Sequence, residues 1–191
     1  MKILCLYNNN CALRLFHWLE ALGHECVYLK DRIDIDWLRE LDVELAISYT
    51  YSKIIKADVI EFLNGNIVNI HNSYLPYNRG SDPNLWSLVE DSPRGVSLHY
   101  IDDKLDRGFI IDQVLLGRPN YNVETLRTTY NELDDAAFEM FKKAFFNYPY
   151  WKDMKKNVIG KGSYHSDKDG EKLRKCITSY DMTVSDFLER I

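Results

Sequence analysis

Residues 67–73 read IVNIHNS, and the first four of them form a nearly continuous apolar run. The stretches ILCLY at residues 3–7 and LAISY at residues 45–49 have the same character. Strands of a parallel sheet are covered by helices on both faces, so they are apolar throughout instead of alternating with polar residues. These three stretches therefore predict buried strands of an α/β sheet.

Segments with helical spacing separate the apolar runs in the first half of the chain. Strands that alternate with helices are typical of βαβ units and hence of a parallel sheet. The expected order is strand 3–7, helix 12–22, strand 26–29, helix 37–41, strand 45–49, helix 54–63 and strand 67–70. The predicted fold class is α/β, with a Rossmann-like, open, mostly parallel sheet and helices on both faces.

The second half of the chain begins with a loop that contains Pro76, Gly80 and Pro83. After the loop, the pattern predicts a short helix at 84–90, paired strands at 95–101 and 109–116, and a long helix at 123–146 with Asn122 as its cap. From residue 148 the chain reads as a basic loop, before an amphipathic stretch at 184–191. We expect one catalytic domain over residues 1–150, and an extension over residues 151–191 that packs on it.

Composition disfavours several classes of protein. The chain has 191 residues, 46% of them hydrophobic, which suffices for one ordinary domain core. A net charge of −5 gives no basic face for nucleic acid, and no apolar run approaches the roughly 20 residues of a membrane helix. Four scattered cysteines lack the spacing of a metal site. We expect a cytoplasmic protein with no metal, no nucleic-acid partner and no membrane partner.

Two polar segments could carry chemistry. Asn69, His71 and Ser73 are spaced by two, so they share one face if the strand continues, and the carboxyl end of a parallel strand is where open α/β folds bind ligands. Asp106 lies in the turn DDKLDRG, which Gly108 closes. Either segment alone could be structural, as a satisfied histidine or a charged turn. His99, in an alternating strand, is interpreted as structural.

Together the two segments carry a longer pattern. NIHNSYLPYNRG at residues 69–80 and LHYIDDKLDRGFIIDQ at residues 98–113 resemble the signature of the folate-dependent formyltransferase family. That family includes glycinamide ribonucleotide transformylase, methionyl-tRNA formyltransferase and sugar N-formyltransferases. The resemblance implies the same α/β fold, a single formyltransferase catalytic domain, and 10-formyltetrahydrofolate as the co-substrate.

The resemblance implies catalytic roles for Asn69, His71 and Asp106. Attack of an amine on the formyl carbon develops an oxyanion, which the Asn69 amide and a protonated His71 can stabilise. The amine must lose a proton while the leaving folate nitrogen gains one, and Asp106 can orient His71 or a bridging water for that transfer. No metal is required.

The resemblance also implies binding residues. The folate pteridine is expected to contact the backbone of two loops. One follows the predicted strand at 45–49 and contains Tyr51, Ser52, Lys53 and Ile54. The other precedes Asp106 and contains Ile101, Asp102 and Leu105. Candidate substrate-binding residues are Asn9, Asn10, Ser73, Arg79 and Gly80. The alternatives are that Asn9 and Asn10 only cap the helix that follows, and that Arg79 only holds its loop.

Departures from the family pattern restrict which acceptor amine we expect. Residues 7–11, YNNNC, lack the glycines with which glycinamide ribonucleotide transformylase holds a phosphate, and the acidic chain lacks a basic surface for tRNA. The loop at 75–87 and the tail at 160–169 resemble those of enzymes that act on a nucleotide-linked amino deoxy sugar, although the tail could be an ordinary surface segment. A formyltetrahydrofolate hydrolase and a non-catalytic binding module remain alternatives, and the resemblance is compatible with a homodimer.

Overall fold

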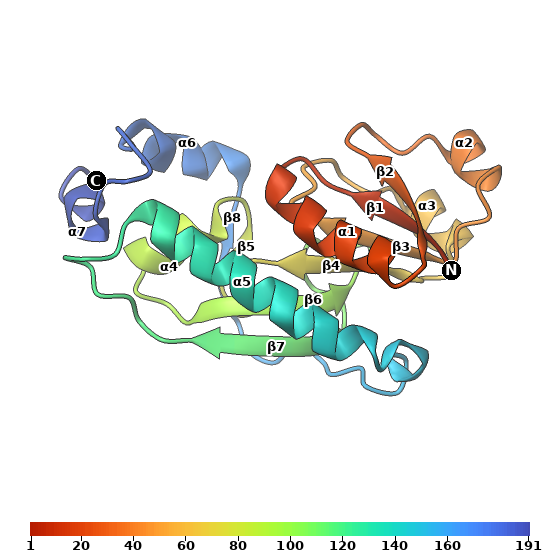
Figure 1. Ribbon diagram of the computed structural model, residues 1–191. Coiled ribbons are helices and arrows are strands. Elements are labelled where there is room, and N and C mark those ends of the chain that lie inside the picture. The colour runs from red at the N-terminus through yellow and green to blue at the C-terminus, as the bar shows by residue number, and fades with distance from the viewer.

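The computed structural model describes all 191 residues, and its centre is a six-stranded sheet in the order β2-β1-β3-β4-β6-β7 (Figure 1). The strands are β1 (Lys2–Leu6), β2 (Glu25–Leu29), β3 (Leu45–Tyr49), β4 (Ile67–His71), β6 (Arg94–Tyr100) and β7 (Ile110–Leu116). The first four pair in parallel, whereas β4–β6 and β6–β7 are antiparallel. The predicted α/β, mostly parallel sheet is confirmed, with an antiparallel edge.

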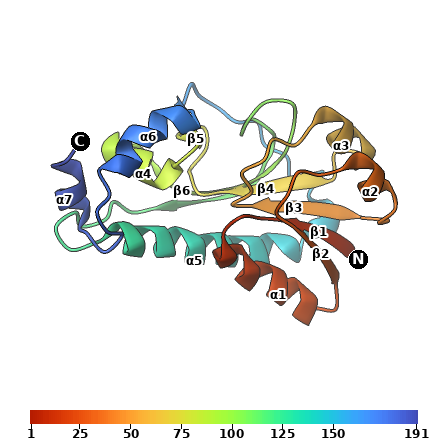
Figure 2. The ribbon, with the colours of Figure 1, turned by 90° about the horizontal axis from the view of Figure 1, so that it is seen from above.

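Helices cover both faces of the sheet, as predicted. On one face lie α1 (Leu13–Ala21) and α5 (Leu126–Phe145), and on the other lie α2 (Ile35–Arg39) and α3 (Ala57–Phe62) (Figure 2). The larger core, of 22 buried residues, joins α1 and α5 to the sheet, while a smaller one lies under α2 and α3. Strand residues such as Cys5 and Leu4 therefore pack in opposite directions, which explains why these strands are apolar at every position.

Two helices start about three residues later than predicted, and α2 starts two residues earlier, at Ile35. The long helix begins after Thr125 and not after Asn122, because the Thr125 hydroxyl accepts from the Thr128 N–H while the Thr128 hydroxyl accepts from the Thr125 N–H. The helix expected from residue 54 begins at Ala57, and Ile54 is 82% exposed. In both cases apolar residues before the helix imitate its spacing.

The tail contains elements that the loop prediction missed. After a 3₁₀ turn (η2, Tyr148–Tyr150) come β8 (Tyr164–His165) and α6 (Asp167–Lys175), while the last helix, α7 (Val184–Leu188), lies in the predicted amphipathic stretch. Strand β8 pairs in parallel with β5 (Arg79–Gly80), and Ser166 caps α6 in a capping box with Asp169. A two-residue strand and a strongly polar helix leave little periodicity in a sequence, so neither was visible there.

The tail packs on the sheet domain through a third core. This core joins α4 (Pro83–Val89), the start of α5, α6 and α7, with Leu85, Leu126, Leu173 and Phe187 among its buried residues. The molecule therefore has two unlike parts, the central sheet and the tail, which meet next to β4.

No helix is both long enough and apolar enough to cross a membrane.

Candidate active site

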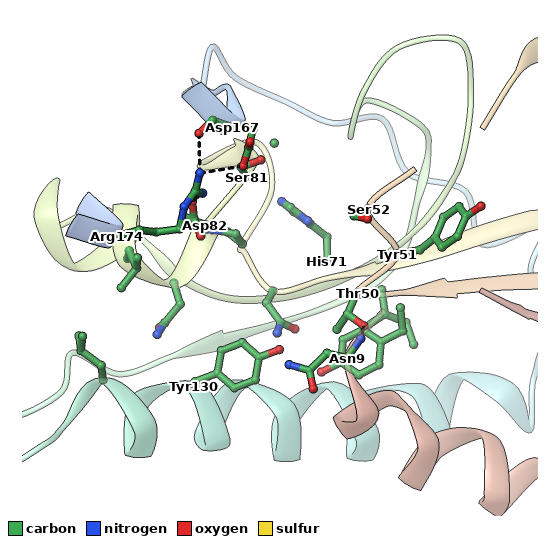
Figure 3. Close-up of a pocket in the computed structure, with 18 of the residues that line it drawn as sticks. Asn9, Thr50, Tyr51, Ser52, His71, Ser81, Asp82, Tyr130, Asp167 and Arg174 are labelled. Carbon is green, nitrogen blue, oxygen red and sulfur yellow. Dashed lines mark hydrogen bonds and ion pairs between the residues drawn. The ribbon is translucent and has the colours of Figure 1, made fainter. Parts of the chain in front are cut away.

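A cleft of about 660 Å³ opens beyond the carboxyl ends of β3 and β4 (Figure 3). Its volume lies within the usual range for small-molecule sites. At one end, called here the loop end, lie Thr50, Tyr51 and Ser52, which follow β3. At the other, called the charged end, lie Asp82, Asp167 and Arg174, with His71 between the two ends.

His71 is the last residue of β4 and is 8% exposed. Its Nε2 lies 3.1 Å from the carbonyl oxygen of Asn78 and 3.7 Å from Oδ2 of Asp106. The carbonyl has no proton to give, so Nε2–H is the donor in that hydrogen bond. The ring is thus fixed from behind by backbone and by a carboxylate.

Asp106 sits in the turn between β6 and β7 with a φ of 51° and is 8% exposed. Its Oδ2 accepts from the Gly80 N–H at 2.8 Å, and its Oδ1 lies 3.6 Å from Nε2 of His99. Burial by itself raises the pKa of this carboxyl, but the nearby His71 and His99 together with the Gly80 N–H outweigh burial and lower it well below its usual range. Asp106 is therefore a carboxylate at neutral pH.

Asn69 completes the group from β4. Its Nδ2 lies 3.3 Å from Nε2 of His99, whose Nδ1–H donates to the Tyr100 carbonyl at 2.8 Å. Asn69 and His99 face each other in the register of β4 and β6. His99, interpreted as structural from the sequence, thus connects Asn69 with Asp106, and only knowledge of which strands pair would have revealed this.

The three predicted catalytic residues are brought together. Asn69 and His71 line the cleft, and Asp106 lies directly behind His71. An amide and an imidazole can donate to an oxyanion, and a carboxylate can hold the imidazole in orientation. The arrangement suits addition to a carbonyl group followed by proton transfer. Ser73 lies beyond the end of β4, is buried and does not line the cleft.

The predicted binding residues divide into two groups. Those that line the cleft are Asn9, Tyr51, Ser52 and Gly80. Those outside its lining are Asn10, Lys53, Ile54, Arg79, Ile101, Asp102 and Leu105. The loops that carry Lys53 and Leu105 flank the site with their backbone. The role of these residues in binding stays a prediction.

Two of these residues, Arg79 and Asn9, have contacts that match the alternative interpretations, whereas the Asn10 side chain caps no helix. The Arg79 guanidinium donates to the carbonyls of Ser163 and Lys161, so it holds its own loop against the tail. The Asn9 side chain accepts from the Cys11 N–H and caps the turn that starts the first helix. Asn10 accepts from Lys30 Nζ at 3.3 Å. A capping role does not remove Asn9 from the cleft, whereas Arg79 points its charge elsewhere.

The charged end was not predicted. Arg174 of α6 pairs with Asp82, at the start of α4, and with Asp167 at 3.0 Å (Figure 3). Burial raises the pKa of Asp82 despite the opposing effect of Arg174. Asp82 and Arg174 are 92 residues apart, and no sequence pattern joins them.

Comparisons with known proteins agree with this geometry. The sequence model of the formyl transferase family matches residues 26–144. The crystal structure of the formyltransferase PseJ from Anoxybacillus kamchatkensis, in complex with UDP-4,6-dideoxy-4-formamido-L-AltNAc and tetrahydrofolate, has a TM-score of 0.84 and 36% identity, covering 100% of this chain and 99% of that one.

Two curated relatives are similar over shorter stretches. A dTDP-4-amino-4,6-dideoxyglucose formyltransferase of Mycobacterium tuberculosis is 31% identical over 124 residues, 65% of this chain and 52% of the relative. A methionyl-tRNA formyltransferase of Fusobacterium nucleatum is 27% identical over 146 residues, 75% of this chain and 43% of the relative. The chain thus spans about half the length of these curated relatives.

Proposed function

The chain belongs to the formyl transferase family, and on that premise we propose that it transfers a formyl group from 10-formyltetrahydrofolate to the amino group of a nucleotide-linked amino deoxy sugar. The observation that carries this proposal is the position of Asn69 and His71 at the middle of the cleft, with the Asp106 carboxylate behind the imidazole. A cleft that extends to both sides of its reactive centre suits two substrates that must meet there.

For the acceptor, we propose the UDP-linked 4-amino-4,6-dideoxy sugar that would yield a 4-formamido product. The support is the likeness to PseJ, whose complex contains UDP-4,6-dideoxy-4-formamido-L-AltNAc and tetrahydrofolate. That likeness extends over both chains almost completely, unlike the partial likeness to the tRNA-directed relative. We place the acceptor at the charged end, where Asp82, Asp167 and Arg174 offer partners for hydroxyl and amide groups of a sugar.

For the donor, we propose the loop end of the cleft. Tyr51 and Ser52 line this end, and the turn at residues 101–105 leads directly to Asp106. The Tyr51 hydroxyl donates to the Asp31 carbonyl and the Ser52 N–H donates to Asn8, so this loop is held in place before any ligand arrives. A fixed loop with free backbone carbonyls suits the flat, polar edge of a pteridine.

The chemistry follows from this placement. The amine nitrogen forms a bond to the formyl carbon, the bond from that carbon to the folate nitrogen breaks, and one proton moves from the amine to the folate nitrogen. In the tetrahedral intermediate, Asn69 and His71 donate hydrogen bonds to the formyl oxygen, which gains negative charge. His71 holds the moving proton, and Asp106 keeps the imidazole oriented. The products are a formamide and tetrahydrofolate.

We also propose that residues 1–150 form the catalytic domain and residues 151–191 an extension packed on it. The contacts of α6 and α7 with α4 and α5 in the third core support this division. Since Asp167 and Arg174 belong to the extension and line the cleft, the extension would contribute to acceptor binding.

The test is release of tetrahydrofolate from 10-formyltetrahydrofolate with a panel of acceptors. The panel contains UDP- and dTDP-linked 4-amino sugars, a 3-amino sugar, glycinamide ribonucleotide and a reaction without amine. We expect turnover with the UDP-linked 4-amino sugar, and a loss of at least about 10²-fold in His71→Ala. His17→Ala, an exposed histidine of α1, is the matched control.

The panel also separates the alternatives. Turnover without amine would replace the proposal with a hydrolase, and turnover only with glycinamide ribonucleotide would replace the acceptor class. Wild-type turnover in folded His71→Ala would remove this imidazole from the mechanism. Circular dichroism on each variant verifies that the fold is retained.

A further inference from the structure

The tail segment Ser163–His165 binds the loop that follows the catalytic strand. The Ser163 hydroxyl accepts from the Asn78 N–H at 2.9 Å and donates to the Asn78 side-chain oxygen at 3.1 Å. The Ser163 carbonyl accepts from the Arg79 N–H, and the Ser163 N–H donates to the Pro76 carbonyl. The Ser163 hydroxyl therefore fixes both the backbone and the side chain of Asn78.

The residues fixed in this way contact the catalytic group directly. The Asn78 carbonyl accepts from Nε2 of His71 at 3.1 Å, and two residues later the Gly80 N–H donates to Asp106 at 2.8 Å. Asn78 is fully buried, and its side-chain nitrogen also donates to Ser92 at 2.8 Å. The position of the Asn78 carbonyl is thus supported by the hydroxyls of Ser163 and Ser92, in addition to the backbone hydrogen bonds between Ser163 and the loop.

The surroundings of His71 distinguish its two ring nitrogens. Nε2 faces the Asn78 carbonyl and the Asp106 carboxylate, and both of these oxygens can only accept. A bare Nε2 would place a lone pair against two acceptors, so the neutral ring must carry its proton on Nε2. The nitrogen that remains to gain or lose a proton is Nδ1.

We infer that Ser163 is a positioning residue for His71: by fixing the Asn78 carbonyl, it keeps a proton on Nε2 and leaves Nδ1 as the atom that exchanges protons during transfer. Ser163 lies outside residues 26–144, the part matched by the family model. The inference deepens the proposed function, since it specifies which atom of His71 moves the proton.

The direct test is the tautomer of His71, read from long-range ¹H–¹⁵N spectra of the full chain at a pH where the ring is neutral. A His71→Gln spectrum assigns the signal among the five histidines. In the wild-type protein we expect the Nε2–H form alone. In Ser163→Ala we expect a mixture of both tautomers, and a kcat lowered on the order of 10- to 100-fold with little change in KM.

Two variants control this test. Ser163→Thr keeps the hydroxyl, so we expect the single tautomer to return, with kcat within about threefold of the wild type. Ser185→Ala, in α7 of the same tail, removes a hydroxyl that does not contact the loop, and we expect no change in tautomer or rate. A role in stability alone would lower the melting temperature of Ser163→Ala without moving the tautomer.

The spectra need no substrate, so this inference can fail independently of the proposed function. A wild-type His71 with its proton on Nδ1 would overturn it before any variant is made. An unchanged tautomer in folded Ser163→Ala would overturn the role of Ser163, whatever acceptor the enzyme uses.

Discussion

Asp106, buried behind the cleft, and Asp82, half-buried in its lining, have pKa values shifted in opposite directions, although burial raises the pKa of both. The pKa of Asp106 lies well below its usual range because attraction to the His71 and His99 imidazoles, which are charged when protonated, and the hydrogen bond from the Gly80 N–H outweigh burial. Asp82 contacts the guanidinium of Arg174, yet burial raises its pKa. Arg174 is shared with Asp167, which itself repels Asp82. Several donors on a rigid sheet therefore hold a buried charge better than one long side chain with two partners.

The largest expected effect separates the two aspartates by activity. Asp106→Asn keeps the shape but removes the charge that orients His71, so we expect kcat to fall by about 10³-fold. Asp82→Asn removes one partner of an ion pair distant from the reacting atoms, and we expect a change of roughly tenfold or less. The measurement is steady-state release of tetrahydrofolate. Equal losses in the two variants would contradict the distinction between the catalytic centre and the charged end.

The next effect separates the catalytic centre from the charged end by stability, through one glycine in each. Gly80 has a φ of 91°, and a Cβ there would lie 2.1 Å from the His165 carbonyl oxygen. We expect Gly80→Ala to lower the free energy of unfolding by more than about 2 kcal/mol, because backbone must move and the strain at positive φ remains. Urea unfolding measures this change.

Gly170 is the matched control at the charged end. A Cβ there would also meet an atom at 2.1 Å, but that atom is Oδ2 of the Asp82 side chain, and Gly170 lies within α6. The side chain can swing away and alanine favours the helix, so we expect Gly170→Ala to change stability by about 1 kcal/mol or less. A larger loss in Gly170→Ala than in Gly80→Ala would mean that the charged end is the more rigid of the two.

The smallest effect is the pH dependence of stability. Asp106 has a lowered pKa, so its contribution is present above the unfolded value of about 3.9 and is lost as the pH falls further. Asp82 has a raised pKa, so its contribution is present below that value and is lost as the pH rises through its folded pKa.

Unfolding between pH 3 and 7 checks these signs. Relative to Asp106→Asn, the wild type should lose stability as the pH falls, and relative to Asp82→Asn it should gain. Parallel curves for the wild type and Asp82→Asn would show that Arg174 fully offsets the burial of Asp82.

The central sheet was largely predictable from the sequence. The runs at residues 3–7 and 45–49 predicted strands because parallel strands covered on both faces are apolar throughout. The spacing of Asn69 and His71 placed both on the cleft. The predicted helix ends were less accurate. Asn122 is a good capping residue by type, but Thr125 and Thr128 form the reciprocal hydrogen bonds that start α5.

The rest of the site depends on contacts between distant segments. His99 joins the catalytic group because β6 pairs with β4 in one register, and Arg174 reaches Asp82 because the tail folds back over α4. Arg79 was a reasonable anion-binding residue by type, but its guanidinium is directed at tail carbonyls. Residue type predicts what a side chain can do, while its direction is set by tertiary packing.

The pairing of β5 with β8 has a consequence for biosynthesis. Asn78 and Ser163 are 85 residues apart, and translation at about 5–20 residues per second would separate their synthesis by about 4 to 17 seconds. All six strands of the main sheet and α5 precede Ser163 in the chain. A nascent chain can thus assemble its sheet while the imidazole still lacks its anchored carbonyl, and it would become competent for catalysis only when the later segment reaches the loop.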